Sequence, residues 1–249
     1  MKIGFCFLVK NEISREKLWK IFFDPVDHSE YSIYIHAKSP VVTTTLQNVF
    51  VERHPVETEW ATISLVKATK KLLTTAFDDG CDAVVFLSGD SLPLWNFSTI
   101  QQICSETLFT LQPKDGLSKK QCQQLTREFQ RIRDFYDLES SRVLAKQNMF
   151  FSIKKSDFEL IRNIKVDSFP AKEVPDEYFW INQLIMKGRS FDNSNYIYAN
   201  DDPTKTQSLE WVIDDNILHQ ARSKGYLFIR KVVGFANTDI WKYYTTLIK

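Results

Sequence analysis

The chain has 249 residues, of which 43% are hydrophobic and 25% are charged, and this composition is typical of a soluble globular protein with one sizeable core. Lysine and arginine total 32 against 31 for aspartate and glutamate, so no overall electrostatic field favours nucleic acid or an anionic membrane as a partner. No stretch approaches the roughly 18 uninterrupted apolar residues of a membrane span, and no signal peptide follows Met1. We therefore expect no membrane span and a cytoplasmic location.

Strands and helices alternate in the first part of the chain. Apolar runs predict strands at residues 3–9, 31–36 and 83–87. Helical periodicity predicts helices at residues 14–23 and 63–77. This βαβαβ order favours an α/β fold in which a mainly parallel sheet is flanked by helices.

Polar segments follow each of the three predicted strands. In such sheets ligands bind beyond the carboxyl ends of the strands, so these segments are candidates for a binding site. The chain contains neither a Gly-x-Gly-x-x-Gly nor a Walker A sequence, so we do not expect the sheet to bind phosphates in either familiar way. The candidate segments are Lys10-Asn11-Glu12, His36-Ala37-Lys38-Ser39 and Ser88-Gly89-Asp90-Ser91.

The chain becomes polar and charged between Leu111 and Arg142. A solvated helix or a mobile connection explains such a stretch, and a flap on the acceptor side is the alternative. Beyond it, the sequence predicts a short strand at residues 150–153 and a helix at residues 156–161. No linker marks a second domain, so we expect a single domain over residues 1–249.

A proline and two carboxylates, Pro175-Asp176-Glu177, open an apolar helix. Proline suits a first helical turn because it lacks the N–H group that has no partner there, and carboxylates are stabilised near the positive end of the helix dipole. One interpretation is an ordinary acidic helix start, and the other is a carboxylate presented as a base at the lip of a cleft. The residues expected to anchor this helix in the core are Tyr178, Phe179, Ile181, Leu184 and Ile185.

The sequence offers no ligand set for a metal ion. The four cysteines, Cys6, Cys81, Cys104 and Cys122, lack the C-x-x-C spacing of zinc and redox sites, so we expect reduced, structural thiols. The histidines also show no ligand spacing. Hard cations prefer carboxylate pairs such as Asp-x-Asp, and no Asp-x-Asp occurs in the chain.

Four short segments occur in an order and at a spacing that resemble one enzyme family. The chain resembles the Core-2/I-branching β-1,6-N-acetylglucosaminyltransferase family, glycosyltransferase family 14, which includes peptide xylosyltransferases. The resemblance extends from about Lys2 to about Val232. It implies a GT-A-type nucleotide-sugar-binding fold, which is Rossmann-like, with a nucleotide-binding half at about 1–100 and an acceptor and catalytic half at about 143–249. The segments are YSIYIHA (31–37), EWATISLV (59–66), FLSGDSLPLWNF (86–97) and PDEY (175–178).

The resemblance implies that no metal or other cofactor is required and that a UDP-sugar is the co-substrate. Without a metal, the departing diphosphate needs fixed positive charge from the protein. Arg230 and Lys231 occupy the place of the family's basic pair, and Lys205 stands for a further basic residue. A solvated strand end is the alternative interpretation of Arg230 and Lys231.

The reaction that the resemblance implies is an inverting transfer of GlcNAc or xylose to a hydroxyl of a glycan or protein acceptor. Glu177 would remove the proton of that hydroxyl as the oxygen attacks the anomeric carbon. In a rival account Asp176 is a second acid, but adjacent residues on a helix diverge by about 100°, which makes opposed attack on one bond awkward. A non-catalytic UDP-sugar- or glycan-binding member of the same fold is the alternative function, because the chain departs from the family pattern at Ala37, Ala61 and Met149.

Further contacts to donor or acceptor follow from the same resemblance. Trp60 matches the family's donor-side tryptophan, and core packing is its alternative role. Ala37 stands where some members carry an aspartate of the uridine site, so the resemblance implies that either Lys38 or Ser39 contributes there or the base is held by the backbone. His36 has a structural hydrogen bond as its alternative role. The residues assigned to donor or acceptor are His36, Lys38, Trp60, Ser88, Gly89, Asp90, Ser91, Asn148 and Asp176.

Overall fold

A computed structural model describes residues 1–39, 44–112, 117–200 and 209–249 of the chain. Its centre is a six-stranded sheet with the strand order β3-β2-β1-β4-β7-β6. β1 pairs in parallel with β2 and β4, and β2 pairs in parallel with β3, whereas β7 is antiparallel to both β4 and β6. The strands are β1 (Ile3–Val9), β2 (Tyr31–Ala37), β3 (Val49–Val51), β4 (Ala83–Ser88), β6 (Leu108–Leu111) and β7 (Gln147–Lys154).

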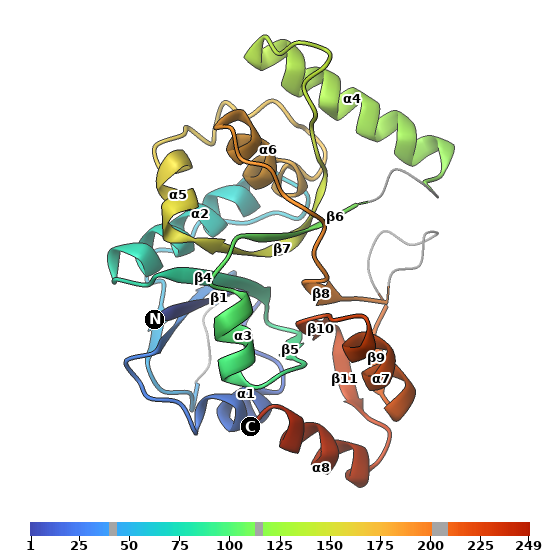
Figure 1. Cartoon of the computed structure of the whole chain (residues 1–249). Helices are drawn as coiled ribbons and strands as arrows, with labels where there is room; N and C mark the ends of the chain where they lie inside the picture. Colours follow the sequence, from blue (N-terminus) through green and yellow to red (C-terminus); the bar gives the residue numbers. More distant parts are fainter. Residues whose placement is uncertain (40–43, 113–116, 201–208) are drawn as a thin grey trace.

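Helices cover both faces of this sheet (Figure 1). Helices α1 (Glu16–Phe23) and α3 (Phe97–Ile103) lie on one face, and Phe5 of β1 contacts aromatic rings of both helices. The other face carries α2 (Ile63–Asp78), α5 (Lys155–Ile161) and α6 (Phe179–Met186). The prediction of an α/β fold with a mainly parallel sheet flanked by helices is therefore confirmed.

The central strands are apolar almost throughout because both of their faces are buried. Every residue of β2 is buried, and in β1 only Leu8 is partly exposed. Phe5 points toward α1 and α3, whereas a Cβ atom on its neighbour Gly4 would meet Ala76 of α2 at 3.1 Å. Successive residues of β1 therefore face opposite sides of the sheet, and each side packs against helices.

Two small sheets and the remaining helices extend the fold toward the C-terminus. One small sheet has the order β5-β10-β8, and the other pairs β11 with β9. The hydroxyl of Tyr244 in the last helix donates to the carbonyl of Pro93 in β5 at 2.6 Å, which joins the C-terminal helix to the body of the fold. The elements are β5 (Ser91–Pro93), β8 (Ile197–Tyr198), β9 (Trp211–Ile213), β10 (Phe228–Arg230), β11 (Val232–Phe235), α4 (Lys119–Tyr136), α7 (Asp215–Ser223) and α8 (Thr238–Leu247).

The polar stretch between Leu111 and Arg142 contains a solvated helix, as predicted. Helix α4 buries only Glu128, Phe129 and Ile132. Its start is fixed by a capping box, in which the Ser118 side chain accepts from the Gln121 N–H and the Gln121 side chain accepts from the Ser118 N–H. In Figure 1 this helix lies apart from the central sheet.

The prediction for the start of the apolar helix was wrong in one respect. Pro175–Glu177 forms a separate 3-10 turn, η1, and α6 begins only at Phe179. Tyr178 separates the two, because its φ of −118° departs from helical values. The expected anchoring by Tyr178, Phe179, Ile181 and Leu184 is confirmed, since all four side chains are buried, whereas the fifth predicted anchor, Ile185, is half-buried.

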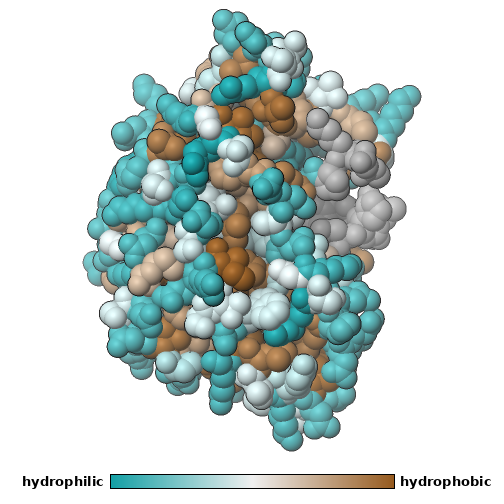
Figure 2. Space-filling model, in the orientation of Figure 1, coloured by the Kyte–Doolittle hydropathy of each residue, from teal (hydrophilic) through white to brown (hydrophobic). Residues whose placement is uncertain are grey.

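The surface and the cysteines also bear on the sequence interpretation. On the face shown in Figure 2, hydrophilic residues predominate and hydrophobic residues form separate patches. Within the described ranges, none of the helices is both long and apolar enough to cross a bilayer. All four cysteines are free thiols, and three of them are buried, with Cys122 exposed.

Candidate active site

The polar segments that follow β1, β2 and β4 meet at one edge of the sheet, as the parallel register requires. The Ser14 N–H donates to the Gly89 carbonyl at 2.7 Å, and the Lys38 N–H donates to the Val9 carbonyl at 3.0 Å. A further backbone bond of 2.7 Å joins the Ser39 N–H to the Lys10 carbonyl. The three predicted segments are therefore neighbours, and they form the carboxyl edge of the sheet.

An ion pair lies at the end of β4. Arg230 is the last residue of β10 and is opposite Ser91 in the antiparallel β10–β5 pair. This pairing brings its guanidinium to the carboxyl edge, where the Nε atom lies 3.4 Å from Asp90 Oδ1. Asp90 Oδ1 also accepts from the Ser88 hydroxyl, whose oxygen is 2.9 Å from Ser91 Oγ. The guanidinium carbon lies 4.9 Å from the centre of the Phe150 ring, which favours a cation–π contact.

A second ion pair lies at the same edge. Lys146 Nζ is 2.8 Å from Glu177 Oε2, and the Glu177 side chain is 22% exposed. Lys146 immediately precedes β7, and β7 runs antiparallel to β4, so the start of β7 and the end of β4 lie together. The ammonium group of Lys146 also lies 5.6 Å from the centre of the Tyr178 ring. Glu177 is thus brought to the carboxyl edge by the turn η1 and by its cation.

Asp176 is buried beside this second pair. The residue is 5% exposed, and its Oδ1 atom has no hydrogen-bond partner among the described residues. Burial, reinforced by the charge of Glu177, raises the pKa of the Asp176 carboxyl to about 7. Burial also raises the pKa of Tyr178, whose buried hydroxyl likewise lacks a partner in the described part of the chain. A sugar or nucleotide group could therefore contact Asp176, as predicted, only if it reached below the protein surface.

The burial of Asp176 predicts a pH-dependent stability. Because the pKa is raised above its unfolded value, the native state holds the proton more tightly, and stability is lost as the pH rises from about 4 through about 7. Asp176→Asn removes this loss, so we expect the variant to gain on the order of 2–4 kcal/mol over wild type between pH 5 and pH 8.5. Urea denaturation at both pH values measures the difference, with Asp192→Asn on the exposed surface as the control. An equal pH response of wild type and Asp176→Asn would refute the interpretation.

The other predicted contact residues are spread around the edge. His36 is fully buried, its Nε2 accepts from the Val56 N–H at 2.8 Å, and burial lowers its pKa, so its alternative structural role fits this position better than ligand contact. Trp60 is 62% exposed, so the alternative of core packing is wrong. Lys38 is also exposed, whereas Asn148 is half-buried and its Oδ1 accepts from the Phe150 N–H.

Of the two remaining basic residues, Lys231 and Lys205, the described part of the chain contains only Lys231. Lys231 is half-buried, and its carbonyl accepts from the Trp211 N–H at 2.8 Å. Lys205 lies outside the described residues. Of the predicted basic residues, Arg230 is therefore the one whose guanidinium is placed directly beside the end of β4.

Gly89 allows a close backbone approach at this edge. A Cβ atom there would lie 2.7 Å from the Glu12 carbonyl and 2.8 Å from Val9 Cγ1. We expect Gly89→Ala to destabilise the protein by about 1–3 kcal/mol, because the segment after β1 must move. Gly234→Ala is the matched control, since no atom lies within 4 Å of the added methyl group. Equal urea midpoints for the two variants would contradict this account.

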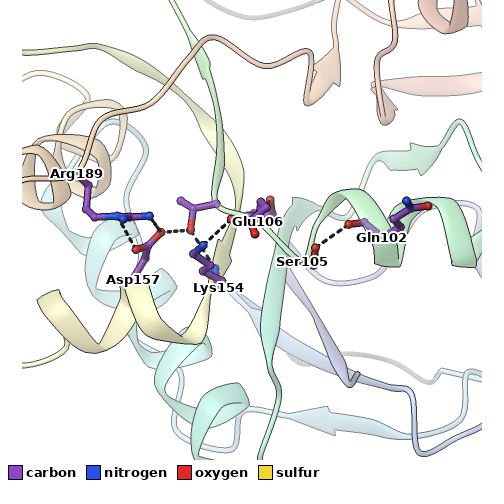
Figure 3. Close-up of polar contacts among 8 residues, drawn as sticks. Gln102, Ser105, Glu106, Lys154, Asp157 and Arg189 are labelled. Atoms are coloured by element: carbon purple, nitrogen blue, oxygen red, sulfur yellow. Dashed lines mark hydrogen bonds and ion pairs between the residues drawn. The ribbon is translucent and has the colours of Figure 1, made fainter.

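Sequence reasoning missed Lys146, because its place depends on the antiparallel register of β7. It also missed two cavities that lie away from the edge. One cavity of about 710 Å³ lies between α2 and residues 163–168. The other, of about 290 Å³, contains the ion pair in which Arg189 Nε lies 2.8 Å from Asp157 Oδ1. Figure 3 shows Arg189 and Asp157 pointing toward one another, with the ion pair of Lys154 and Glu106 nearby.

Two carboxylates at the edge are each matched by a cation. Glu177 is paired with Lys146, and Asp90 is paired with Arg230. Within the ranges that the structure describes, no three His, Cys, Asp or Glu side chains are grouped so that they could hold a metal ion. The described edge is therefore chemically suited to an anionic ligand that can exchange with these carboxylates, since its cations are already in place.

The chain is similar to known proteins over parts of its length. The family model of the Core-2/I-Branching enzyme matches residues 3–163, which is more than half of the chain. Glycosyltransferase BC10 of Oryza sativa subsp. japonica is 28% identical over 104 residues, which are 39% of this chain and 26% of the rice protein. The match thus spans about a quarter of the rice protein's length. Among solved structures, galactosyltransferase LgtC in complex with donor and acceptor sugar analogs is similar with a TM-score of 0.43 and 10% identity, covering 80% of this chain and 75% of LgtC.

Proposed function

The chain belongs to the Core-2/I-branching enzyme family and is a glycosyltransferase, and from this premise we propose an inverting, metal-independent transfer from a UDP-sugar. The donated sugar is GlcNAc or xylose, and the acceptor is a hydroxyl of a glycan or a protein. The residues before about 100 supply the nucleotide side of the site, and those after about 143 supply the acceptor side and the base.

The observation that carries this proposal is the presence of two separate ion pairs at one edge of the sheet. Lys146 holds Glu177, and Phe150 packs under the guanidinium of Arg230. Lys146 and Phe150 are four residues apart on an extended segment, so their backbones are separated by at most about 13 Å. The Glu177 carboxylate and the Arg230 guanidinium are thus both held by residues 146–150, as neighbouring base and diphosphate sites require.

Glu177 is the general base of the proposed reaction. Its carboxylate takes the proton of the acceptor hydroxyl, and the acceptor oxygen forms a bond to the anomeric carbon. The bond from that carbon to the β-phosphate oxygen breaks on the opposite side, and its electron pair leaves with UDP. The anomeric configuration is therefore inverted in one step. No general acid is needed, because UDP is a stable leaving group once its charge is compensated.

The charge of the leaving group is compensated by Arg230 and Lys231, with Lys205 as a further contributor. A guanidinium can donate two hydrogen bonds to a phosphate, and an ammonium acts as a compact charge. Asp90 is the present partner of Arg230, and the long separation of 3.4 Å favours exchange of this carboxylate for a diphosphate oxygen. Fixed cations at this place support a reaction that does not require a metal.

The departures from the family pattern support a second candidate, a non-catalytic protein that binds a UDP-sugar or a glycan. They concern Ala37, Ala61 and Met149. Ala61 has a φ of +60°, so it keeps the left-handed conformation that glycine, common in the family at this place, adopts without strain. The backbone beside Trp60 thus has a conformation that glycine would also adopt, so we take this departure to favour the enzyme.

A chromatographic assay of UDP release separates the two candidates. The protein is incubated with UDP-GlcNAc or UDP-xylose in excess EDTA, with and without a mixture of glycan and peptide acceptors. We expect UDP release that persists in EDTA and increases when the right acceptor is present. Binding of a UDP-sugar without any release would favour the non-catalytic candidate, and release that EDTA abolishes would refute metal independence.

A further inference from the structure

The outer face of α2 carries a group of lysines that the proposed reaction does not use. Lys67, Lys70 and Lys71 are spaced at i, i+3 and i+4, so they share one face of the helix. They line the cavity of about 710 Å³, whose opposite wall is residues 163–168 and includes Lys165. We call this cavity, with its four lysines, the lysine groove. Its volume lies within the range of small-ligand sites.

The lysines are held in place by contacts across the groove. Lys70 Nζ donates to the Ile164 carbonyl at 2.6 Å, and burial lowers the pKa of Lys70. Lys67 pairs with Asp167, and Lys71 Nζ lies 3.1 Å from Glu52 Oε1. Two carboxylates thus face four ammonium groups, which leaves a local excess of positive charge in a chain whose net charge is only +1.

This arrangement is unfavourable for the helix alone. Like charges at i,i+3 and i,i+4 repel one another and destabilise a helix. The sequence of α2 has no acidic residue before Asp78 at its end, so no carboxylate on the helix relieves the repulsion. An ordinary solvated face would also leave its lysines in water, whereas Lys70 is partly desolvated. An anionic ligand in the groove would relieve both costs.

One wall of the groove leads toward the proposed base. The segment after α5 runs back along α2, and its contacts fall progressively nearer the start of that helix. The turn η1, which carries Glu177, then packs against α2. A chain-like ligand in the groove could therefore extend toward the carboxyl edge of the sheet. The successive contacts are Arg162 with Asp78, Ile164 with Lys70, and Asp167 with Lys67.

We propose that the lysine groove binds an anionic oligosaccharide, bearing carboxylate or sulfate groups, as the extended part of the acceptor. This inference rests on the proposed function, because it gives the acceptor side of that site its substrate class. The ammonium groups supply charge, and Thr74, Thr75, Asn163 and Ser168 line the same cavity with groups that can bond to sugar hydroxyls. The groove lies on the helix layer and not at the strand ends, so it is distinct from the proposed diphosphate site.

Calorimetric titration with a chondroitin sulfate hexasaccharide tests the proposal, with chitohexaose as the neutral probe. We expect wild type to bind the sulfated probe, to bind the neutral probe at least about ten-fold more weakly, and to lose affinity as salt is added. Lys70→Gln/Lys165→Gln should weaken binding of the sulfated probe by about ten-fold, because two of the four cations are lost. Lys187→Gln/Lys224→Gln, which removes two exposed lysines elsewhere, is the matched control.

The outcomes distinguish this inference from the proposed function. If the double variant fails to fold, Lys165→Gln alone tests the groove, since that side chain is exposed, and it should weaken binding about three-fold.

Unchanged binding in the groove variants, or no binding to wild type, would overturn the inference. Stronger binding of a polyglutamate peptide through the same lysines would replace the oligosaccharide with an acidic protein. Displacement of the probe by free UDP would mean that the groove is the donor site. UDP release from a UDP-sugar is assayed in parallel, so loss of either activity is seen separately.

Discussion

Replacement of Glu177 by glutamine is expected to slow sugar transfer by about 10²- to 10⁴-fold while leaving the affinity for UDP nearly unchanged. Glutamine has almost the same size and shape as glutamate, but its amide cannot take the proton of an acceptor hydroxyl. UDP does not require that proton transfer in order to bind. Initial rates of transfer, together with calorimetric titration of UDP, measure the two effects on the same protein sample.

The control for this prediction is Glu173→Gln. Glu173 lies four residues before Glu177 and forms an exposed ion pair, with its Oε1 atom 3.1 Å from Arg127 Nη2. Exposed pairs contribute about 0–1 kcal/mol to stability, so the control should fold and transfer sugar as wild type does. Retention of wild-type turnover by Glu177→Gln would remove Glu177 from the role of base. Equal losses in both variants would mean that the segment acts only by its structure.

Arg230→Gln is expected to weaken UDP binding by about 10- to 100-fold, because charge-assisted hydrogen bonds to a phosphate are lost. Uridine carries no phosphate, so its affinity should change little, and the comparison isolates the diphosphate contact. Titration of wild type and variant with UDP and with uridine checks both statements. Arg230→Lys keeps the charge but not the two-fold donor geometry, and it should fall between the two proteins.

The structure also supplies a control for the loss of Arg230. Without its guanidinium, Asp90 remains as a negative charge beside the diphosphate, and this repulsion adds to the loss. The double variant Arg230→Gln/Asp90→Asn removes the added charge and should recover part of the affinity for UDP. Wild-type affinity of Arg230→Gln for UDP would contradict the assignment. A matching loss for uridine would show instead that the nucleoside site has been disturbed.

The parallel part of the fold could be predicted because its signals are local. Buried parallel strands are apolar nearly throughout, and those of β1, β2 and β4 lie within one residue of the predicted ranges. Helix α2 likewise shows a clear period and a Thr62 N-cap. β7 follows a long polar stretch, and its antiparallel partner β4 is about 60 residues away in sequence, so neither its start nor its direction was accessible. The short strands β5, β8 and β10 are too brief to show a period.

The candidate site likewise has one part that local sequence signals predict and another that depends on contacts between distant segments. The edge formed by the segments after β1, β2 and β4 follows from the parallel register, and the structure brings these segments together. The partner of Glu177 did not follow, because Lys146 reaches it only through the register of β7. The turn at Pro175 was predicted as helix, since proline and carboxylates favour a 3-10 turn and an α-helical start alike. The lysine groove is formed by a helix and a loop that are almost 100 residues apart in sequence, so no local sequence pattern could predict it.

The central claim is that the described edge binds a UDP-sugar without a metal. Calorimetric titration with UDP-GlcNAc, UDP-xylose, UDP-glucose, UDP-galactose and free UDP, each with and without EDTA, tests it most directly. The account predicts tight binding of one of the first two sugars, with an affinity that EDTA does not change and that Arg230→Gln reduces. No binding of any UDP-sugar, or binding that EDTA abolishes, would contradict it.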